Sequence, residues 1–206
     1  MKKLDEKAWE LLNGGYDLHV HTAPSAFPRA LDSFQLVREA NEAGMSGVML
    51  KSHYEPTAIR AALVNLYSNC KTRAYGAVVW MPTRDSANSL VFGDMEGDFF
   101  NRRGITILEE DGRLKPVVYD IMDAVKKQGA SLATGHLSPR ESILLCREGR
   151  SRGVRMILTH PEFCRTVISA DLQEEMADLG VIIEKNWLNV AAGMVTIEQI
   201  AANIRR

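Results

Sequence analysis

The sequence predicts an α/β protein in which parallel strands alternate with helices, either as a (β/α) barrel or as an open, doubly wound sheet. Three observations support this fold class. Short apolar runs recur along the 206 residues, and a helical pattern follows most of them. These runs lack the strict alternation of a half-exposed strand, which is typical of strands covered on both faces. No Gly-x-Gly-x-x-Gly opens any expected helix, which argues against a dinucleotide-binding sheet.

The apolar runs and their polar boundaries give the expected elements in chain order. Strands are expected at 16–21, 47–53, 74–83, 129–136, 154–160 and 180–186. Helices are expected at 31–44, 56–68, 116–129, 138–153, 169–180 and 196–206. A turn near Asp111 and Gly112 predicts a hairpin over 104–116, within a loop insertion at about 93–115. Because only one strand fits between residues 69 and 83, a barrel built this way would be short of one or two βα units.

Capping residues mark the starts of several helices. The expected N-caps are Asp32 or Ser33, Ser138, Ser169 and Thr196. Glu141 and Gln199 stand three residues after their caps and complete capping boxes. No low-complexity linker separates the units, so residues 1–206 are expected to form a single domain.

Composition excludes several classes of function. The formal net charge is -1 and no basic block is present, so a nucleic-acid partner is not expected. No apolar run approaches the ~18 residues that span a bilayer, and the first residues lack the apolar core of a secretory signal. The three scattered cysteines, Cys70, Cys146 and Cys164, predict reduced thiols in a cytoplasmic protein. A small-molecule substrate remains as the expected partner, and the chain gives no preference between a monomer and a homo-oligomer.

All five histidines fall at the C-terminal ends of expected strands, where the active sites of parallel barrels lie. They are His19, His21, His53, His136 and His160. His19 and His21 point to the same face because successive strand residues alternate. Two such imidazoles can approach one ion at ~2.0–2.1 Å, and imidazole is a good ligand for zinc and iron. The histidines therefore predict a divalent metal site, with hydrogen-bonded structural histidines as the alternative interpretation.

The chain resembles the metal-dependent hydrolases of the amidohydrolase superfamily, through DLHVH at 17–21, TGH at 134–136 and LTHPE at 158–162. The combination with GVMLKSH and VVWMPT is similar to a branch of that superfamily without an established substrate. The resemblance implies a TIM-like (β/α) barrel of the metallo-dependent hydrolase type. It also implies one or two divalent ions on His19, His21, His136 and His160, with zinc preferred over manganese or iron.

The resemblance implies that the protein is an enzyme in which a metal-activated water hydrolyses a small, anionic amide, lactone or ester. The superfamily pattern places an aspartate on an eighth strand, and the sequence ends within what reads as the seventh helix. The general base is then open, and Glu184 is the candidate. Lys51 is a second catalytic candidate, since a carboxylated lysine can bridge ions.

Three residues are candidates for binding the substrate: Arg29, Thr22 and Lys51. Arg29 can fork onto a carboxylate or phosphate. Two alternatives stand beside the hydrolase. DLHVHT also resembles the polymerase-and-histidinol-phosphatase family of phosphoesterases, whose barrel has seven strands. A catalytically silent metal-binding barrel is the alternative of another class, favoured by the missing aspartate.

Overall fold

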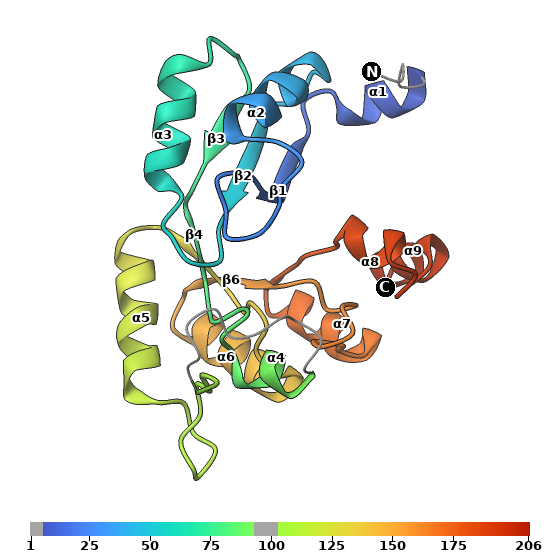
Figure 1. Cartoon of the computed structure of the whole chain (residues 1–206). Helices are drawn as coiled ribbons and strands as arrows, with labels where there is room; N and C mark the ends of the chain where they lie inside the picture. The colour runs from blue at the N-terminus through green and yellow to red at the C-terminus, as the bar shows by residue number, and fades with distance from the viewer. Residues whose placement is uncertain (1–5, 93–102) are drawn as a thin grey trace. The chain divides into compact units, whose positions relative to one another are not determined.

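The computed structural model describes residues 6–92 and 103–206 (Figure 1). Over these ranges the chain is a mixed α/β protein with two parallel sheets, which confirms the α/β class. The chain divides into two compact units, Met1–Ala77 and Val78–Arg206. The first part of the predicted insertion, residues 93–102, lies outside the described residues.

The first unit contains three parallel strands in the order β1-β2-β3. Its elements are α1 (Glu6–Leu12), β1 (Tyr16–His21), α2 (Ser33–Glu42), β2 (Gly47–Lys51), α3 (Ala58–Tyr67) and β3 (Arg73–Tyr75). Helices α2 and α3 contact each other and the strands. The core is a cluster of small and branched side chains from these elements: Val37, Ala40, Val48, Leu50, Ala61, Val64 and Ala74. Lys51 follows Leu50 in β2, so its side chain leaves the opposite face of the strand.

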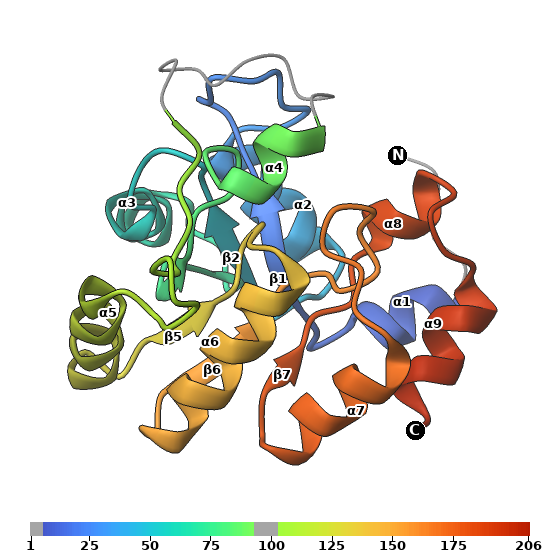
Figure 2. The same ribbon diagram turned by 90° about the horizontal axis from the view of Figure 1, so that it is seen from below.

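The second unit contains four parallel strands in the order β4-β5-β6-β7. Its first elements are β4 (Val78–Trp80), α4 (Ala87–Phe92), α5 (Pro116–Lys127), β5 (Ser131–Ala133) and α6 (Pro139–Ser151). Next come β6 (Arg155–Leu158), α7 (Ala170–Asp178), β7 (Ile182–Ile183), α8 (Trp187–Ala191) and α9 (Ile197–Ile204). Helix α6 lies alongside β6 and α7 alongside β7 (Figure 2). Leu132 and Met156 are register partners in β5 and β6, and both are fully buried against the helices.

The run 74–83, predicted as one strand, forms two strands in different sheets. β3 ends at Tyr75 and pairs with β2, whereas β4 begins at Val78 and pairs with β5. Gly76 stands at the break, where an added Cβ would lie 2.6 Å from the backbone nitrogen of Ala58. The chain therefore passes too close to the start of α3 for a side chain. The single-strand prediction was wrong because pairing partners, not the apolar run, decide where a strand ends.

The predicted capping residues are confirmed. Asp32, not Ser33, is the N-cap of α2, and its side chain accepts a hydrogen bond from the backbone of Gln35. The capping boxes of α6 and α9 and the Ser169 cap of α7 are also present. The predicted hairpin is reduced to one antiparallel bridge, between Leu108 and Leu114, and Gly112 turns between them with a φ of 83°.

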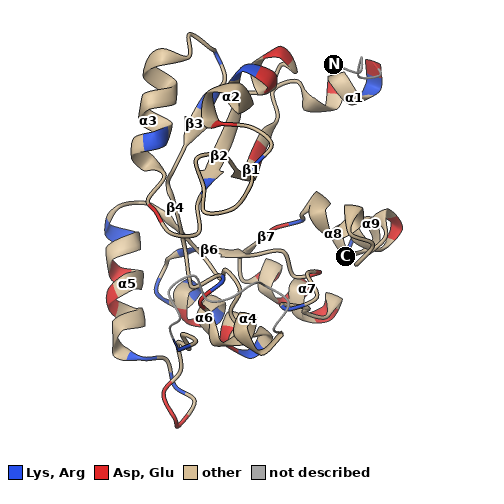
Figure 3. Cartoon of the chain, in the orientation of Figure 1, with Lys and Arg blue, Asp and Glu red and all other residues tan. Residues whose placement is uncertain are grey.

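In the described residues, both basic and acidic side chains are found in each of the two units (Figure 3). In the described part of the chain, no helix combines the length and apolar character needed to cross a bilayer. The three cysteines are free thiols. Cys146 is fully buried, whereas Cys164 is exposed.

Candidate functional site

The structure places all five histidines at the C-terminal ends of strands. His19 and His21 lie in the last three residues of β1. The other three follow their strands by two or three residues: His53 follows β2, His136 follows β5 and His160 follows β6. They form two groups, one in each unit, and each group is described by itself.

In the first unit, the rings of His19 and His21 lie together. Their centroids are 5.3 Å apart and the ring planes are inclined by 59°. The register of β1 on β2 pairs His21 with Lys51, after an irregularity between Asp17 and Val20. The carboxylate of Asp17 accepts a hydrogen bond of 3.0 Å from the backbone N–H of His19. The register places His21 on the side of the sheet opposite to core residue Leu50, and the ring contact brings His19 beside it.

His53 joins this group by stacking on His21. The ring centroids are 4.5 Å apart and the planes are inclined by 24°. Phe27, from the loop after β1, packs its edge on His53 at 5.9 Å. The guanidinium of Arg29 lies 5.8 Å from the centroid of the Phe27 ring. An aromatic layer therefore brings Arg29 into the neighbourhood of the β1 histidines.

The environment keeps His21 neutral. Burial, which disfavours the charged imidazolium, is the main cause that lowers the pKa of His21 to about 2. The positive charges of His53, Lys51, His19 and Arg29 contribute to this lowering, in that order of importance. Only the neutral imidazole can offer a lone pair to a metal ion. At physiological pH His21 is in the form that a ligand requires.

The predicted substrate-binding residues of the first unit have different surroundings. Lys51 is almost fully buried, at 2 % exposure, on the histidine side of β2. Thr22 is also buried, and its hydroxyl lies 2.7 Å from that of Ser33. Arg60 of α3 donates to the hydroxyl and the carbonyl of Thr22, both at 3.2 Å. The Thr22 hydroxyl therefore has a clear structural use.

Arg60 is a residue that the sequence interpretation missed. Besides Thr22, its guanidinium donates to the carbonyl of Pro24 at 2.9 Å and forms an ion pair with Glu55. Burial lowers the pKa of Arg60 below its usual value. One side chain thus ties the loop after β1 to the loop after β2. Its helical position at the start of α3 gave no sequence signal, because these contacts are 5 to 38 residues away.

In the second unit, His136 and His160 form a second pair with similar geometry. Their ring centroids are 5.1 Å apart and the planes are inclined by 59°. Both side chains are at least nine-tenths buried. The ring of Phe163 lies 5.6 Å from His136 and 5.0 Å from His160. Neighbouring parallel strands bring the pair together, because β5 and β6 end side by side.

Two threonines lock the strand ends that carry this pair. The hydroxyl of Thr134 accepts from the backbone N–H of Thr159 at 3.0 Å, and the hydroxyl of Thr159 accepts from Gly135 N–H at 3.1 Å. Gly135 has a φ of 61°. A Cβ on it would lie 2.9 Å from the Pro82 carbonyl oxygen and closer still to that of Met81. Glycine is required here by both conformation and space.

The sequence interpretation also missed four hydroxyl and amide side chains around the second pair: Ser86, Asn88, Ser89 and Thr166. Ser86 donates to the His136 carbonyl at 2.8 Å, and Asn88 donates to the same oxygen at 3.2 Å. Ser89 lies 3.2 Å from the Nδ1 of His136, and Thr166 lies 3.4 Å from the Nδ1 of His160. The polar cluster SANS at 86–89, just before and within the start of a short helix, was the available signal.

Glu184 and Lys185 directly follow β7. Glu184 is partly buried, and its backbone N–H donates to the carbonyl of Leu158 at 3.0 Å. Lys185 turns toward α7, where it donates to the side-chain oxygen of Gln173 at 2.5 Å and forms an ion pair with Glu162. The described bonds of Glu162 go to Lys185 and Asn203.

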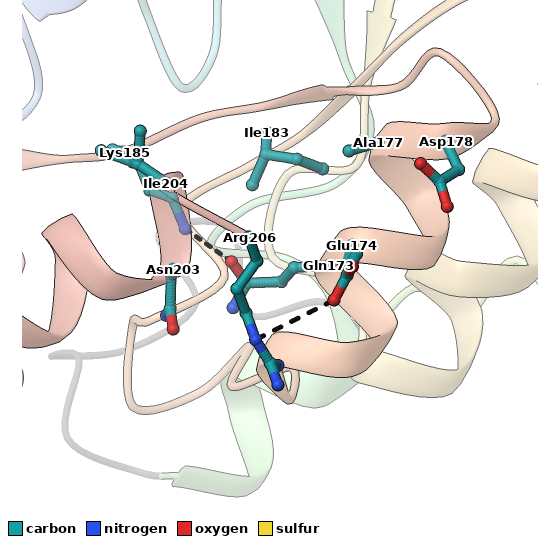
Figure 4. A pocket seen from close by; sticks show the side chains of 9 residues that line it. All are labelled: Gln173, Glu174, Ala177, Asp178, Ile183, Lys185, Asn203, Ile204 and Arg206. Atoms are coloured by element: carbon teal, nitrogen blue, oxygen red, sulfur yellow. Dashed lines mark hydrogen bonds and ion pairs between the residues drawn. The ribbon is translucent and has the colours of Figure 1, made fainter.

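Lys185 also lines a small cavity of about 260 Å³ between α7, β7 and α9 (Figure 4). Figure 4 shows Lys185 directed at Gln173, and Arg206 directed at Glu174. Asp178 is the other acidic residue of the lining, so the charges of the lining cancel. Apolar contacts come from Ala177, Ile183 and Ile204.

Each histidine pair has the ring separation expected of two ligands of one divalent ion. Two imidazoles bound to one tetrahedral zinc at ~2.0–2.1 Å place their ring centroids about 5 Å apart. The observed separations of 5.3 Å and 5.1 Å match this value. In residues 6–92 and 103–206, no group of three or more His, Cys, Asp or Glu side chains is placed to hold one ion.

Comparison with known proteins identifies a family for this chain but assigns it no activity. A family model matches residues 14–79 and 69–184, and it is described as a family of unknown function (DUF6282). No curated protein matches the chain. No solved structure matches it either.

Proposed function

The chain belongs to this family of unknown function, and we propose from the geometry of its histidines that it is a metal-dependent hydrolase of the amidohydrolase type. The observation that carries the proposal is the pair of matching imidazole pairs. His19 and His21, and His136 and His160, have ring separations of 5.3 Å and 5.1 Å and the same 59° inclination. Both pairs offer imidazole nitrogens, which suit zinc, with manganese or iron as alternatives.

A bound divalent ion supplies Lewis acidity, which makes water more acidic and a carbonyl or phosphoryl group more electrophilic. The chain's own residues supply binding and proton transfer. Lys51 and Arg29 offer positive charge beside the first pair, which suits an anionic amide, lactone or ester. His53 is the third histidine predicted as a ligand here; it stacks on His21, but the described residues bring no three His, Cys, Asp or Glu side chains to one ion.

Glu184 is proposed as the general base. The neighbouring Lys185 already bonds to Glu162 and Gln173, so Glu184 is the one of these two residues that we assign as the base. A carboxylate at a strand end can accept a proton from an attacking water and return it to the leaving group.

We also propose that the α/β fold is a TIM-like (β/α) barrel of the metallo-dependent hydrolase type. Seven parallel strands lie in the described residues, and histidines occupy the C-terminal ends of four. That strand number also favours the second candidate function, a phosphoesterase of the polymerase-and-histidinol-phosphatase type. A cytoplasmic location is proposed with either function, on the three free cysteines.

Metal content of the purified full chain tests the proposal. Elemental analysis should find one or two equivalents of zinc, manganese or iron, and each metal should raise the melting temperature of chelator-treated protein. The double variants His19→Ala/His21→Ala and His136→Ala/His160→Ala should each lose metal. Leu18→Ala is the matched control, because it truncates a side chain on the same strand that is 55 % exposed.

Three results would count against the proposal in different ways. Absence of metal in the wild-type protein, together with no thermal shift on adding it, would refute it. Unchanged metal content in a double variant would remove that pair from the site. Bound metal without turnover on a panel of amides, lactones and phosphate esters would leave the catalytically silent barrel.

A further inference from the structure

His160 is held in an unusual backbone conformation. Its φ is 29°, in the left-handed region that residues other than glycine rarely adopt. It also precedes Pro161, and a following proline disfavours helical backbone conformations. Such strain persists only where the surroundings fix it, and it is concentrated at functional sites.

Thr166 supplies much of that fixation. The His160 carbonyl accepts from the Phe163 N–H at 2.9 Å and from the Thr166 hydroxyl at 3.1 Å. The Thr166 backbone N–H donates to the Phe163 carbonyl at 2.8 Å, which closes the turn over residues 160–166. The Thr166 side chain is 2 % exposed, so water does not compete for these bonds.

The same hydroxyl also faces the imidazole of His160. Its oxygen lies 3.4 Å from Nδ1. A threonine hydroxyl has one proton and two lone pairs. Because the proton is given to the His160 carbonyl, the contact with Nδ1 requires Nδ1 to be the donor. In a neutral imidazole the lone pair then resides on Nε2.

The contact of Ser89 with His136 does not fix a tautomer in this way. Ser89 lies 3.2 Å from Nδ1 of His136, and either atom can be the donor. At His160 the direction of the bond to Nδ1 is determined, because the Thr166 hydroxyl donates its only proton to the His160 carbonyl.

We propose that Thr166 is a positioning residue that holds His160 as the Nδ1–H tautomer, with Nε2 as its metal-binding nitrogen. The role rests on the proposed function, because a fixed tautomer serves catalysis only if His160 is a ligand. Partners that fix the tautomer of a ligating histidine typically change metal affinity by 10–100-fold when they are removed.

Nitrogen-15 NMR of the metal-free, full-length protein tests the tautomer directly. Spectra of histidine-labelled protein at about pH 8, above the ordinary histidine pKa of ~6.5, report which ring nitrogen carries the proton. His160→Gln identifies the His160 signals by their loss. The wild-type protein should show Nδ1–H at His160. Thr166→Val should give a mixture of tautomers, whereas Thr166→Ser, which keeps the hydroxyl, should retain Nδ1–H.

Zinc affinity, measured by titration of the same proteins with zinc ion alone, tests the consequence. Thr166→Val should weaken zinc binding by about 10–100-fold, and Thr166→Ser should restore most of the loss. Thr72→Val is the matched control. Thr72 is also 2 % exposed and donates to a backbone carbonyl at 2.6 Å, but in the first unit and away from any histidine. It should leave both the tautomer and the affinity unchanged.

The two experiments separate the two claims. An Nε2–H tautomer, or an equal mixture, in the wild-type protein would overturn the role of Thr166. An Nδ1–H tautomer that depends on the hydroxyl, in a protein that binds no zinc, would support the positioning and refute the metal enzyme. Zinc binding that is equal in Thr166→Val and wild type would also overturn the proposal, even with the tautomer as expected.

Discussion

Replacing Gly135 with alanine should destabilise the second unit far more than an ordinary glycine substitution. Gly135 lies between β5 and His136 with a φ of 61°. An added Cβ would meet the backbone of the segment after β4: the Pro82 oxygen at 2.9 Å, the Met81 carbonyl carbon at 3.0 Å and the Met81 oxygen closer still. Real Cβ atoms do not approach backbone atoms this closely, so the segment must move.

Two costs add at this position. Left-handed backbone costs a residue with a Cβ roughly 1–2 kcal/mol, and forcing extra atoms into a packed site costs about 1–3 kcal/mol. The free energy of unfolding should therefore fall by about 2–5 kcal/mol, provided the costs are additive. For a protein of this size, about 2–4 °C of melting temperature is lost per kcal/mol.

Gly193→Ala separates the two costs. Gly193 has a φ of 68°, but nothing lies within 4 Å of its added Cβ, so this variant bears only the backbone cost. Urea unfolding of both variants should give a gap of at least about 1 kcal/mol, Gly135→Ala being the less stable. Equal losses would refute the close approach of the Met81–Pro82 backbone, and with it the argument that glycine is required before His136.

Two further predictions concern buried groups of the second unit. Burial raises the pKa of Glu141, but hydrogen bonds from Ser138, Thr106 and Ile107 outweigh it and hold this pKa below its usual value. Glu141→Gln should therefore lower the free energy of unfolding by about 1–3 kcal/mol at pH 7. The difference between variant and wild type should shrink as the pH falls through the lowered pKa, because the carboxylate contributes only while ionised. A difference in urea unfolding that stays constant down to about pH 3 would contradict this origin. Burial also raises the pKa of the Cys146 thiol to about 12. A thiol reagent at about pH 8 should therefore label exposed Cys164 in the native protein, and Cys146 only after unfolding. Rapid labelling of Cys146 in the native protein would show that its site opens.

Features set by neighbouring residues could be predicted from the sequence. The capping boxes at Ser138 and Thr196 depend on side chains three residues apart, and the structure contains both. The histidines were placed at strand ends because each follows a short apolar run, and all five lie there. The likeness of the His19–His21 pair to a metal site also comes from local geometry, since alternate residues of one strand share a face.

Only the tertiary structure decided what surrounds those histidines. Ser89 is 47 residues from His136, and Arg60 is 38 residues from Thr22, so no local pattern links them. The run 74–83 reads as one strand, yet it divides at Gly76 between two sheets, because β2 and β5 lie far from it in the sequence and pair with its two halves. By itself the sequence determined the helix caps and the position of each histidine after an apolar run, because a few adjacent residues fix the backbone there. Strand partners, the buried hydroxyls and the approach of Met81 to Gly135 required the folded chain, because those energies arise between residues that only packing brings together.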